Sequence, residues 1–258
     1  MISEKILEGL PLSDIFVFDA HGHVGKSATL PVSKHTAEDV VETITRLGVR
    51  AICASHFEAI LSDTEKGNKM LAEDVKKSGG KLFGYYTPSP FYEDEELQRY
   101  FEEGTGFLGV KLHASFQQTS LLNEGYAPAL SLANEKKLPV LVHVWSAAEV
   151  SGVGELASRY KDSPFIIAHA GLIDSLRDGA IAVCKAHDNV FFDTAISFAP
   201  EGSLEYLISK VGADRVVYGS DTPTFDGTMS FARLGMANIP EADKIKIFGE
   251  NAKKLFKI

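Results

Sequence analysis

The sequence of 258 residues predicts an α/β protein, a (β/α)8 TIM barrel. Short runs of β-branched and aromatic residues recur along the chain, and a loop and a helical pattern follow each run. Such near-continuous apolar runs are typical of strands buried on both faces, as in a parallel sheet. Eight strands that alternate with eight helices over about 250 residues are the pattern of this barrel.

The elements follow one another in the order that the barrel requires. The predicted strands are IFVFDAH (15–21), VRAICASH (49–56), KLFGYYTP (81–88), FLGVKLH (107–113), PVLVHVW (139–145), FIIAHAG (165–171), NVFFDTA (189–195) and RVVYGSD (215–221). Helical candidates between them include TAEDVVETITRLG (36–48), EELQRYFEEG (95–104), YAPALSLANEKK (126–137) and EGSLEYLISKVG (201–212). Gly48, Gly104 and Gly212 are the expected C-caps. Because no linker or low-complexity tract divides the chain, we expect one domain over residues 1–258.

An open doubly wound sheet is the alternative fold. It would normally carry a glycine-rich phosphate loop with G-x-G-x-x-G spacing after its first strand. The segment at that place is AHGHVGKS, which lacks this spacing. The sequence therefore favours the barrel.

Composition and charge narrow the classes of function. The formal net charge is −9, which argues against nucleic acid or an anionic membrane as a partner. No apolar run approaches the roughly 20 residues that cross a bilayer, and the acidic start MISEKILEGLPLSD is unlike a signal peptide. Cys53 and Cys184 are too few for a disulfide framework. We expect a cytoplasmic protein that acts on a small-molecule substrate, with a homodimer as the default assembly.

The segment FDAHGHVG contains the first candidate functional residues. Residues i and i+2 of a strand lie on the same face, so His21 and His23 point the same way from the end of the first strand. Two imidazoles placed in this way can chelate one metal ion. The alternative is a turn in which both histidines are merely polar.

Histidines gather at strand ends throughout the sequence. The chain has eight histidines, and six of them lie at or beside predicted strand ends: His21, His23, His56, His113, His143 and His169. Asp221 follows the last strand in GSD. Barrel enzymes build their sites at these ends, so the pattern predicts a metal site on one rim. A divalent ion held by imidazoles and a carboxylate lowers the pKa of bound water from 15.7 towards about 7. Asp221 is suited to accept the proton of that water.

The ordered motifs resemble the amidohydrolase superfamily and, within it, the amidohydrolase-2 (amidohydrolase-related) family. The resemblance depends on DAHGH, GVKLH, VLVHVW, IIAHAG, YGSDTP and the final GENAKKLF, and it covers nearly the whole chain. It implies that His21, His23 and His143 bind metal and that Asp221 both binds metal and handles protons. It also implies that His169 either orients the attacking water or is itself a ligand.

Other residues near the strand ends have two interpretations each. Lys111 and His113 share a face of the fourth strand, where they could bind a substrate carboxylate, or Lys111 could bridge two metal ions as a carbamate. Trp145 could line the substrate pocket or simply pack. Asp19 could orient an imidazole or make a buried structural hydrogen bond.

Three functions remain open from the sequence. The main hypothesis is a metal-dependent hydrolase of an amide, ester or lactone bond in a small metabolite. The alternative is a metal-dependent decarboxylase of a small aromatic or unsaturated acid, an activity that the same family contains. Short loops favour hydrolysis over decarboxylation, and the second alternative is an inactive barrel that serves as a binding protein. The expected cofactor is a divalent metal, zinc, with one ion per chain favoured over two.

Overall fold

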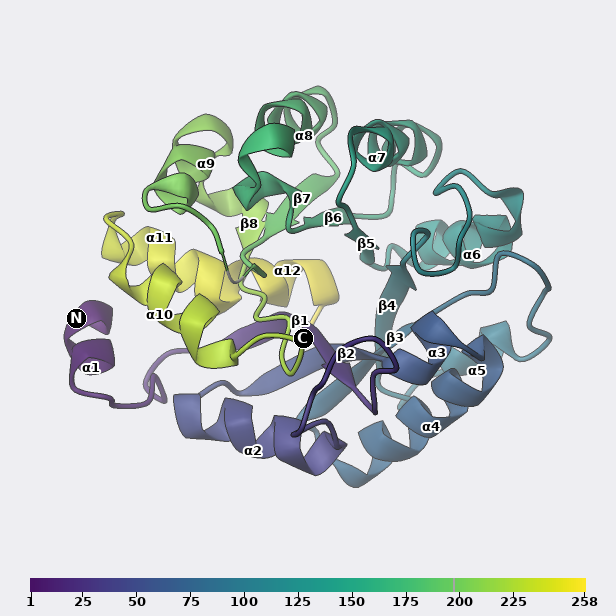
Figure 1. The fold of residues 1–258 in the computed structure, drawn as a ribbon, viewed down its shortest axis with the longest axis horizontal. Helices are drawn as coiled ribbons and strands as arrows, with labels where there is room; N and C mark the ends of the chain where they lie inside the picture. Colours follow the sequence, from purple (N-terminus) through teal and green to yellow (C-terminus); the bar gives the residue numbers. More distant parts are fainter. Residues whose placement is uncertain (197) are drawn as a thin grey trace.

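Eight parallel strands pair in chain order around a curled sheet (Figure 1). The structure is a computed structural model, and it describes residues 1–196 and 198–258. The strands are β1 (Phe18–Val24), β2 (Ala51–His56), β3 (Leu82–Tyr86), β4 (Phe107–Leu112), β5 (Val140–His143), β6 (Phe165–Ala168), β7 (Val190–Asp193) and β8 (Val216–Val217).

Backbone hydrogen bonds join the last strand region to the first. The N–H of Ala20 donates to the carbonyl of Tyr218 at 2.8 Å, and the N–H of Asp221 donates to the carbonyl of His21 at 2.8 Å. The N–H of His23 donates in turn to the carbonyl of Thr222 at 2.7 Å. These bonds close the ring, and the predicted (β/α)8 barrel is confirmed.

Helices surround the strands on the outside of the ring (Figure 1). They are α1 (Ile2–Leu7), α2 (Ala37–Leu47), α3 (Phe57–Leu61), α4 (Thr64–Lys77), α5 (Leu97–Tyr100), α6 (Ala127–Lys136), α7 (Ala147–Arg159), α8 (Asp174–Ala186), α9 (Ser203–Val211), α10 (Gly227–Met236), α11 (Glu241–Ile245) and α12 (Asn251–Phe256). Short helical turns connect several of them, at Glu124–Tyr126, Ala170–Leu172, Ala213–Arg215 and Lys246–Glu250.

The two ends of α2 show how the local sequence determines where a helix begins and ends. Thr36 caps its start, because the Thr36 hydroxyl accepts from the N–H of Asp39 while the Asp39 side chain accepts from the N–H of Thr36. Gly48 ends the helix with φ of 81°, and a Cβ there would lie 2.6 Å from the backbone nitrogen of Leu12. The predicted helix and its glycine cap are therefore confirmed.

Several predicted bounds differ from the structure, and β8 covers only Val216–Val217 of the strand predicted over 215–221. The first strand runs from Phe18 to Val24 rather than over 15–21, because its pairing with β2 begins at Phe18 and continues to Val24. His21 and His23 therefore lie within the strand. The helix predicted over 95–104 spans only Leu97–Tyr100, since the hydroxyl of Thr105 donates to the carbonyl of Tyr100 at 2.6 Å. Gly104 thus lies beyond the helix and is not its C-cap.

The interior of the barrel is apolar below the site. A buried cluster comprises Phe18, Ala20, Ala51, Cys53, Tyr85, Leu141, Ile166, Ala168, Val217, Ala252 and Phe256. Phe256, from α12, places its ring 5.1 Å from that of Phe18 and 6.1 Å from that of Tyr85. The last helix therefore seals the floor of the barrel.

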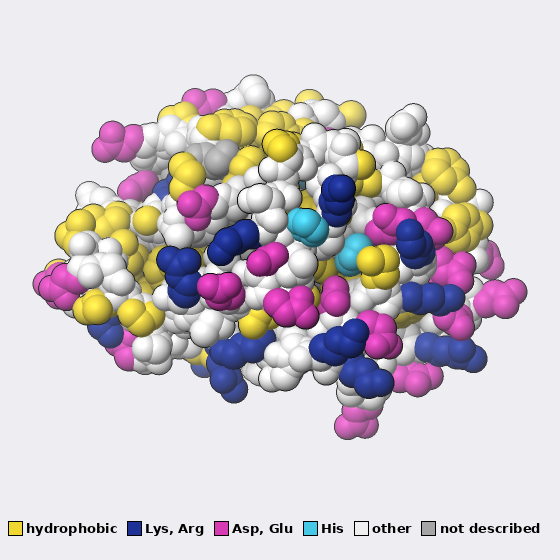
Figure 2. Space-filling view, turned by 60° about the horizontal axis from the view of Figure 1, so that its bottom comes forward, with side chains coloured by type: hydrophobic (Ala, Val, Ile, Leu, Met, Phe, Trp, Pro, Cys, Tyr) yellow, Lys and Arg dark blue, Asp and Glu magenta, His cyan; other side chains and the backbone are white. Residues whose placement is uncertain are grey.

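The surface carries charges of both signs. On the face shown in Figure 2, basic side chains lie beside acidic ones, and histidine side chains reach the surface near its centre. None of the helices in the described part of the chain is long and apolar enough to cross a membrane. Cys53 and Cys184 are both free and buried.

Candidate metal centre

The strands bring the predicted site residues to the carboxyl ends of the barrel. These residues come from β1 (His21, His23), β4 (Lys111), the end of β5 (His143), the residue after β6 (His169) and the segment after β8 (Asp221). Two groups of side chains lie close enough to hold a metal ion: His21, His23 and Asp221, and His21, His169 and Asp193. The rim thus concentrates imidazoles and carboxylates from strands far apart in the sequence.

The imidazole of His21 is oriented by a carboxylate on β7. Its Nδ1 atom lies 2.6 Å from Oδ2 of Asp193, and both side chains are fully buried. Since an ionised carboxylate only accepts, Nδ1 carries the proton, and Nε2 has a lone pair that accepts from Nζ of Lys111 at 3.1 Å. This is the pairing that orients metal-binding histidines in many proteins.

His169 and His23 are fixed in similar ways. Nδ1 of His169 donates to the carbonyl of Ala195, which leaves Nε2 of His169 with a lone pair. Nδ1 of His23 lies 3.0 Å from the hydroxyl of Ser55. When that hydroxyl accepts, Nε2 of His23 is also unprotonated.

These Nε2 atoms surround the carboxylate of Asp221. Oδ1 of Asp221 lies 3.0 Å from Nε2 of His23 and 3.7 Å from Nε2 of His21. Oδ2 lies 3.9 Å from Nε2 of His169. Oδ1 is nevertheless a buried oxygen that makes no hydrogen bond to any residue in the described ranges 1–196 and 198–258. Lone pairs that face one another across such distances repel unless a cation lies between them.

The buried environment keeps the imidazoles neutral. Burial lowers the pKa of His21 well below its usual range, and the nearby Lys111 lowers it further. Burial also lowers the pKa of His23 and, more strongly, that of His143. Burial alone would raise the pKa of Asp221, but the charges that His21 and His23 carry when they are protonated outweigh burial and hold that pKa below its usual range. Neutral imidazoles beside an ionised carboxylate are the protonation states that a metal ion requires.

The backbone is unusual at two of these residues. His169 and Asp221 have φ values of 67° and 59°, in a region that residues other than glycine rarely adopt. Conformations of this kind cost about 1–3 kcal/mol and occur mostly at functional sites. The strain is consistent with a fold that holds both side chains in a required position.

His143 and Lys111 lie beside this group. Nδ1 of His143 is 3.2 Å from Nε2 of His169, and Nζ of Lys111 is 3.1 Å from Nε2 of His21. Burial lowers the pKa of Lys111 to about 8. Lys111, rather than His113, therefore lies level with His21. His143 belongs to neither three-residue group among the described residues, so its predicted role as the third ligand stays a prediction.

A cavity of about 380 Å³ opens onto the site. Its lining comprises His23, Leu30, Phe57, Ile60, His113, Ser115, Phe116, His143, Trp145, His169, Asp221, Thr224 and Phe225. His113 and Trp145, both predicted to bind substrate, are among these residues. Lys111 is fully buried and does not line the cavity, so its predicted contact with a substrate carboxylate stays a prediction.

Sequence reasoning missed Asp193 and Ser55. Asp193 is the last residue of β7, within the predicted strand NVFFDTA, so the same strand-end argument could have identified it. Ser55 carried no such signal. Asp19, by contrast, accepts the N–H groups of His21 and Ser220 at 3.1 and 3.0 Å, and so makes the structural hydrogen bond that was one of its two interpretations.

The residues present fit a divalent metal ion. Nε2 lone pairs of imidazoles converge on an ionised carboxylate, and one of its buried oxygens has no hydrogen-bond partner among the described residues. Imidazole and carboxylate donors suit zinc and manganese alike. The fold and the site together are those of a TIM barrel with a candidate metal-binding site at the carboxyl ends of its strands.

The sequence profile of the amidohydrolase family, type 2, matches residues 18–258. The chain therefore belongs to the amidohydrolase-2 family, a metal-dependent family of the amidohydrolase superfamily, as the motifs predicted. A search of curated proteins gives no match.

Solved structures share the fold at low sequence identity. A dihydroxybenzoic acid decarboxylase from Polaromonas with bound manganese and the inhibitor 2-nitroresorcinol is 18% identical, with a TM-score of 0.72 over 94% of this chain and 97% of that one. The 5-carboxyvanillate decarboxylase of Novosphingobium aromaticivorans, complexed with manganese and 4-hydroxy-3-methoxy-5-nitrobenzoic acid, is 14% identical, with a TM-score of 0.74 over 96% and 97%. An amidohydrolase 2 from Bifidobacterium longum subsp. infantis is 17% identical, with a TM-score of 0.70 over 95% and 99%.

Proposed function

We propose that the protein is a metal-dependent decarboxylase that releases carbon dioxide from a small aromatic carboxylic acid. The observation that carries this proposal is the cavity of about 380 Å³, whose walls are aromatic and whose inner end holds the imidazoles and Asp221. A volume of this size fits a small ring-bearing acid. The reacting carboxylate would then lie at the metal centre.

Stacked aromatic rings form part of the cavity lining. The ring of His113 stacks on that of Phe116 at 4.2 Å with 9° between the planes, and on that of His143 at 3.7 Å with 16°. The ring centroids of Trp145 and His143 lie 6.0 Å apart, and the two ring planes meet at 25°. Because His113 lies between Phe116 and His143, these stacked rings form one fixed aromatic side of the cavity, beside which the ring of a planar substrate would bury apolar area.

The structural neighbours support the same class of substrate. The Polaromonas and Novosphingobium proteins are decarboxylases of aromatic acids, and both were solved with bound manganese. Each match extends over 97% of the decarboxylase chain, so no additional domain separates those enzymes from this fold. The short loops that favoured hydrolysis in the sequence therefore count for less.

The proposed reaction assigns distinct roles to the residues. Decarboxylation breaks the bond between the ring carbon and the carboxylate, leaves the electron pair on the ring carbon, and needs one proton at that carbon. A divalent ion, when bound, would hold the oxygen atoms of the acid and offset their negative charge. His169 would hold the proton at Nε2, since its Nδ1 is fixed on the carbonyl of Ala195. The ionised carboxylate of Asp221, 3.9 Å away, would stabilise the protonated imidazole.

Hydrolysis of an amide, ester or lactone is the second candidate function. The observation in its favour is the position of the Asp221 carboxylate, 3.0 Å from Nε2 of His23 and 3.7 Å from Nε2 of His21, because a carboxylate beside a metal ion can accept a proton from attacking water. Asp221 and His169 would be the proton carriers in either reaction. The two candidates therefore differ in the bond that breaks, and assays can separate them.

The test is an assay of the metal-loaded enzyme, prepared separately with zinc and with manganese. Release of carbon dioxide from 2,6-dihydroxybenzoate, 5-carboxyvanillate and related hydroxybenzoates would be compared with hydrolysis of a panel of lactones and amides. In D2O, decarboxylation should place one deuterium on the ring carbon that carried the carboxylate. Turnover of the lactones or amides, with no release from any aromatic acid, would overturn the proposal.

A pair of variants links the activity to the site. His169→Asn should lower kcat by about 100-fold or more, as expected on loss of a general acid. His187→Asn, at the end of α8, removes a histidine remote from the rim and should keep full activity. An equal rate in the two variants would remove His169 from the proposed reaction.

A further inference from the structure

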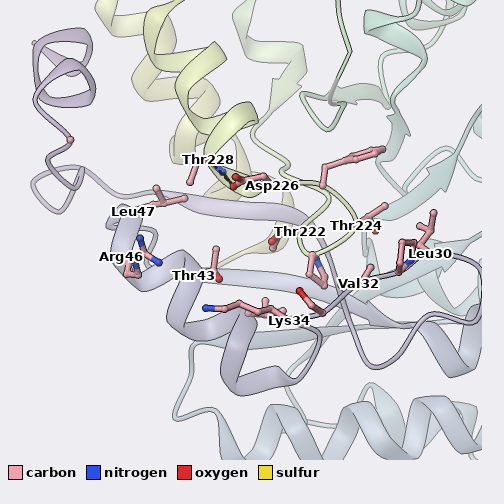
Figure 3. A pocket seen from close by; sticks show the side chains of 17 residues that line it. Leu30, Val32, Lys34, Thr43, Arg46, Leu47, Thr222, Thr224, Asp226 and Thr228 are labelled. Atoms are coloured by element: carbon pink, nitrogen blue, oxygen red, sulfur yellow. Dashed lines mark hydrogen bonds between the residues drawn. The ribbon is translucent and has the colours of Figure 1, made fainter.

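A second and larger cavity, of about 800 Å³, lies beside the candidate metal centre (Figure 3). It is enclosed by the connection between β1 and α2, by one face of α2, and by the connection between β8 and α10. Leu30, Thr224 and Phe225 line both this cavity and the smaller one at the metal centre. The two cavities thus meet along a shared wall.

The second cavity contains more positive than negative charge. Lys34 and Arg46 line it, and neither forms an ion pair with any residue in the described part of the chain. The acidic side chain in the lining, Asp226, accepts the N–H and the hydroxyl of Thr228 at 2.9 and 2.7 Å. Asp226 is therefore engaged as the N-cap of α10. A local excess of cations is notable in a chain with a net charge of −9.

The hydroxyl groups in the lining differ in whether they already donate a hydrogen bond within the protein. The hydroxyl of Thr43 donates to the carbonyl of Asp39 at 2.9 Å, and that of Thr228 donates to Asp226, so neither proton is free for a ligand. Oγ1 of Thr224 is buried, and within residues 1–196 and 198–258 it has no hydrogen-bond partner. The groups available to bind an anion therefore include Lys34, Arg46 and the hydroxyl of Thr224 in the shared wall.

Apolar side chains form the rest of the lining. They are Leu30, Pro31, Val32, Val40, Leu47, Pro223 and Phe225. Val40, Thr43 and Leu47 share one face of α2, and Figure 3 shows Lys34 extending along that face towards Thr43 and Arg46. The cavity thus combines apolar walls with a cationic end, as small-molecule sites commonly do.

We propose that this cavity binds a small organic anion. The carboxylate or phosphate group of the ligand pairs with Lys34 and Arg46, where the guanidinium offers two parallel N–H donors. The apolar body lies against α2 and the connection between β1 and α2, and the hydroxyl of Thr224 donates to a polar atom of the ligand. This site is separate from the metal centre and does not depend on the proposed decarboxylation.

The test is a calorimetric titration of the metal-loaded protein with phenyl phosphate. The variant Lys34→Gln/Arg46→Gln should bind phenyl phosphate at least tenfold more weakly than the natural protein. The matched control is Arg50→Gln/Lys76→Gln, which removes the same charges from two exposed side chains outside the cavity and should bind as the natural protein does. Thr43→Trp fills the cavity without changing its charge and should weaken binding too.

Two results would overturn the proposal. One is equal affinity in the Lys34→Gln/Arg46→Gln variant and its matched control. The other is binding that disappears in His21→Ala/His23→Ala but persists in Lys34→Gln/Arg46→Gln, because phenyl phosphate would then occupy the metal centre. Circular dichroism of each variant separates lost binding from lost folding.

A further measurement tests whether the second cavity and the cavity at the metal centre can be occupied by separate molecules at the same time. Trp145 is the one tryptophan of the chain and lines the cavity at the metal centre, so its fluorescence reports binding of 2-nitroresorcinol there. Simultaneous binding of 2-nitroresorcinol and phenyl phosphate assigns the second cavity to a separate molecule. Mutual exclusion would place phenyl phosphate in the cavity at the metal centre and would count against a separate anion site. Failure of 2-nitroresorcinol to bind would count against the proposed function and leave the phenyl phosphate test unchanged.

Discussion

The Nδ1 atom of His21 and the carboxylate of Asp193 lie 2.6 Å apart and join the first and seventh strands inside the barrel. The pair fixes the proton of His21 on Nδ1, so Nε2 carries a lone pair, 3.1 Å from Nζ of Lys111 and 3.7 Å from Oδ1 of Asp221. It therefore prepares His21 for a metal ion before any ion arrives. Burial raises the pKa of Asp193 to about 6, because ionising this carboxyl group costs more free energy in the barrel interior than in water.

Asp193→Asn should weaken metal binding. The substitution keeps the shape of the side chain but removes the charge that holds Nδ1–H of His21, and loss of such a partner typically lowers metal affinity about 10- to 100-fold. The measurement is a metal dissociation constant from competition with a chelator. Asp188→Asn is the matched control, because Asp188 is fully exposed near the start of the same strand. Equal metal affinity in both variants would show that the pair is merely structural.

Removing both histidines of β1 should abolish metal binding. His21→Ala/His23→Ala deletes both imidazoles that approach the unpartnered Oδ1 of Asp221, so the purified protein should contain far less than one ion per chain. Elemental analysis measures the metal content, and far-UV circular dichroism checks that the barrel is folded. A folded variant with a full complement of metal would refute the chelate.

Lys111 tests whether one ion or two serves each chain. Lys111→Met keeps an unbranched side chain of similar length but cannot form a carbamate. On the expectation of one ion, the metal content should stay at one per chain, because Lys111 is not needed to complete the group of His21, His23 and Asp221. A fall from two ions to one or none on substitution would instead identify Lys111 as a bridge between ions.

His56 should make the protein less stable in mild acid. Its Nδ1 accepts the N–H of Glu58 at 3.0 Å, and burial lowers its pKa to about 4, from an ordinary value of 6.5. As the pH falls from 6.5 to 4, the unfolded chain takes up a proton that the folded chain does not. The free energy of unfolding should therefore fall through this window, by at most about 3 kcal/mol from this group.

The measurement for His56 is urea unfolding at several pH values. His56→Asn keeps an acceptor for the N–H of Glu58 but does not titrate. As the pH falls from 6.5 to 4, the free energy of unfolding should fall more in the natural protein than in His56→Asn. His187→Asn serves as the control, since other buried histidines titrate equally in all three proteins. A pH-independent difference for His56→Asn would be incompatible with the lowered pKa.

The fold could be predicted because its signals are local. Each apolar run occupies a strand, and Thr36 and Gly48 bound α2 as their chemistry requires. Boundaries set by long-range pairing were less predictable. The first strand begins three residues later than expected, because pairing with Ala51 decides where the strand starts.

The candidate site was predictable where a polar residue ends an apolar strand. That rule places the histidines and Asp221 on one rim, and it applies equally to Asp193. That rule could not decide between Lys111 and His113. Which of the two side chains is level with His21 depends on how far β4 is displaced along the barrel relative to β1, and local sequence does not encode this displacement. The second cavity had no sequence signal, since Lys34, Arg46 and Thr224 come from three separate segments and form no motif.

Phe256 closes the barrel on the side opposite the rim. With that end sealed, a small molecule would reach the candidate metal centre from the rim side, where the cavity lies. Trp145 lines that cavity, and its exposed ring lies 5.7 Å from that of Phe198, centroid to centroid. A reactant and a product that both pass on this side would therefore share a route beside Trp145.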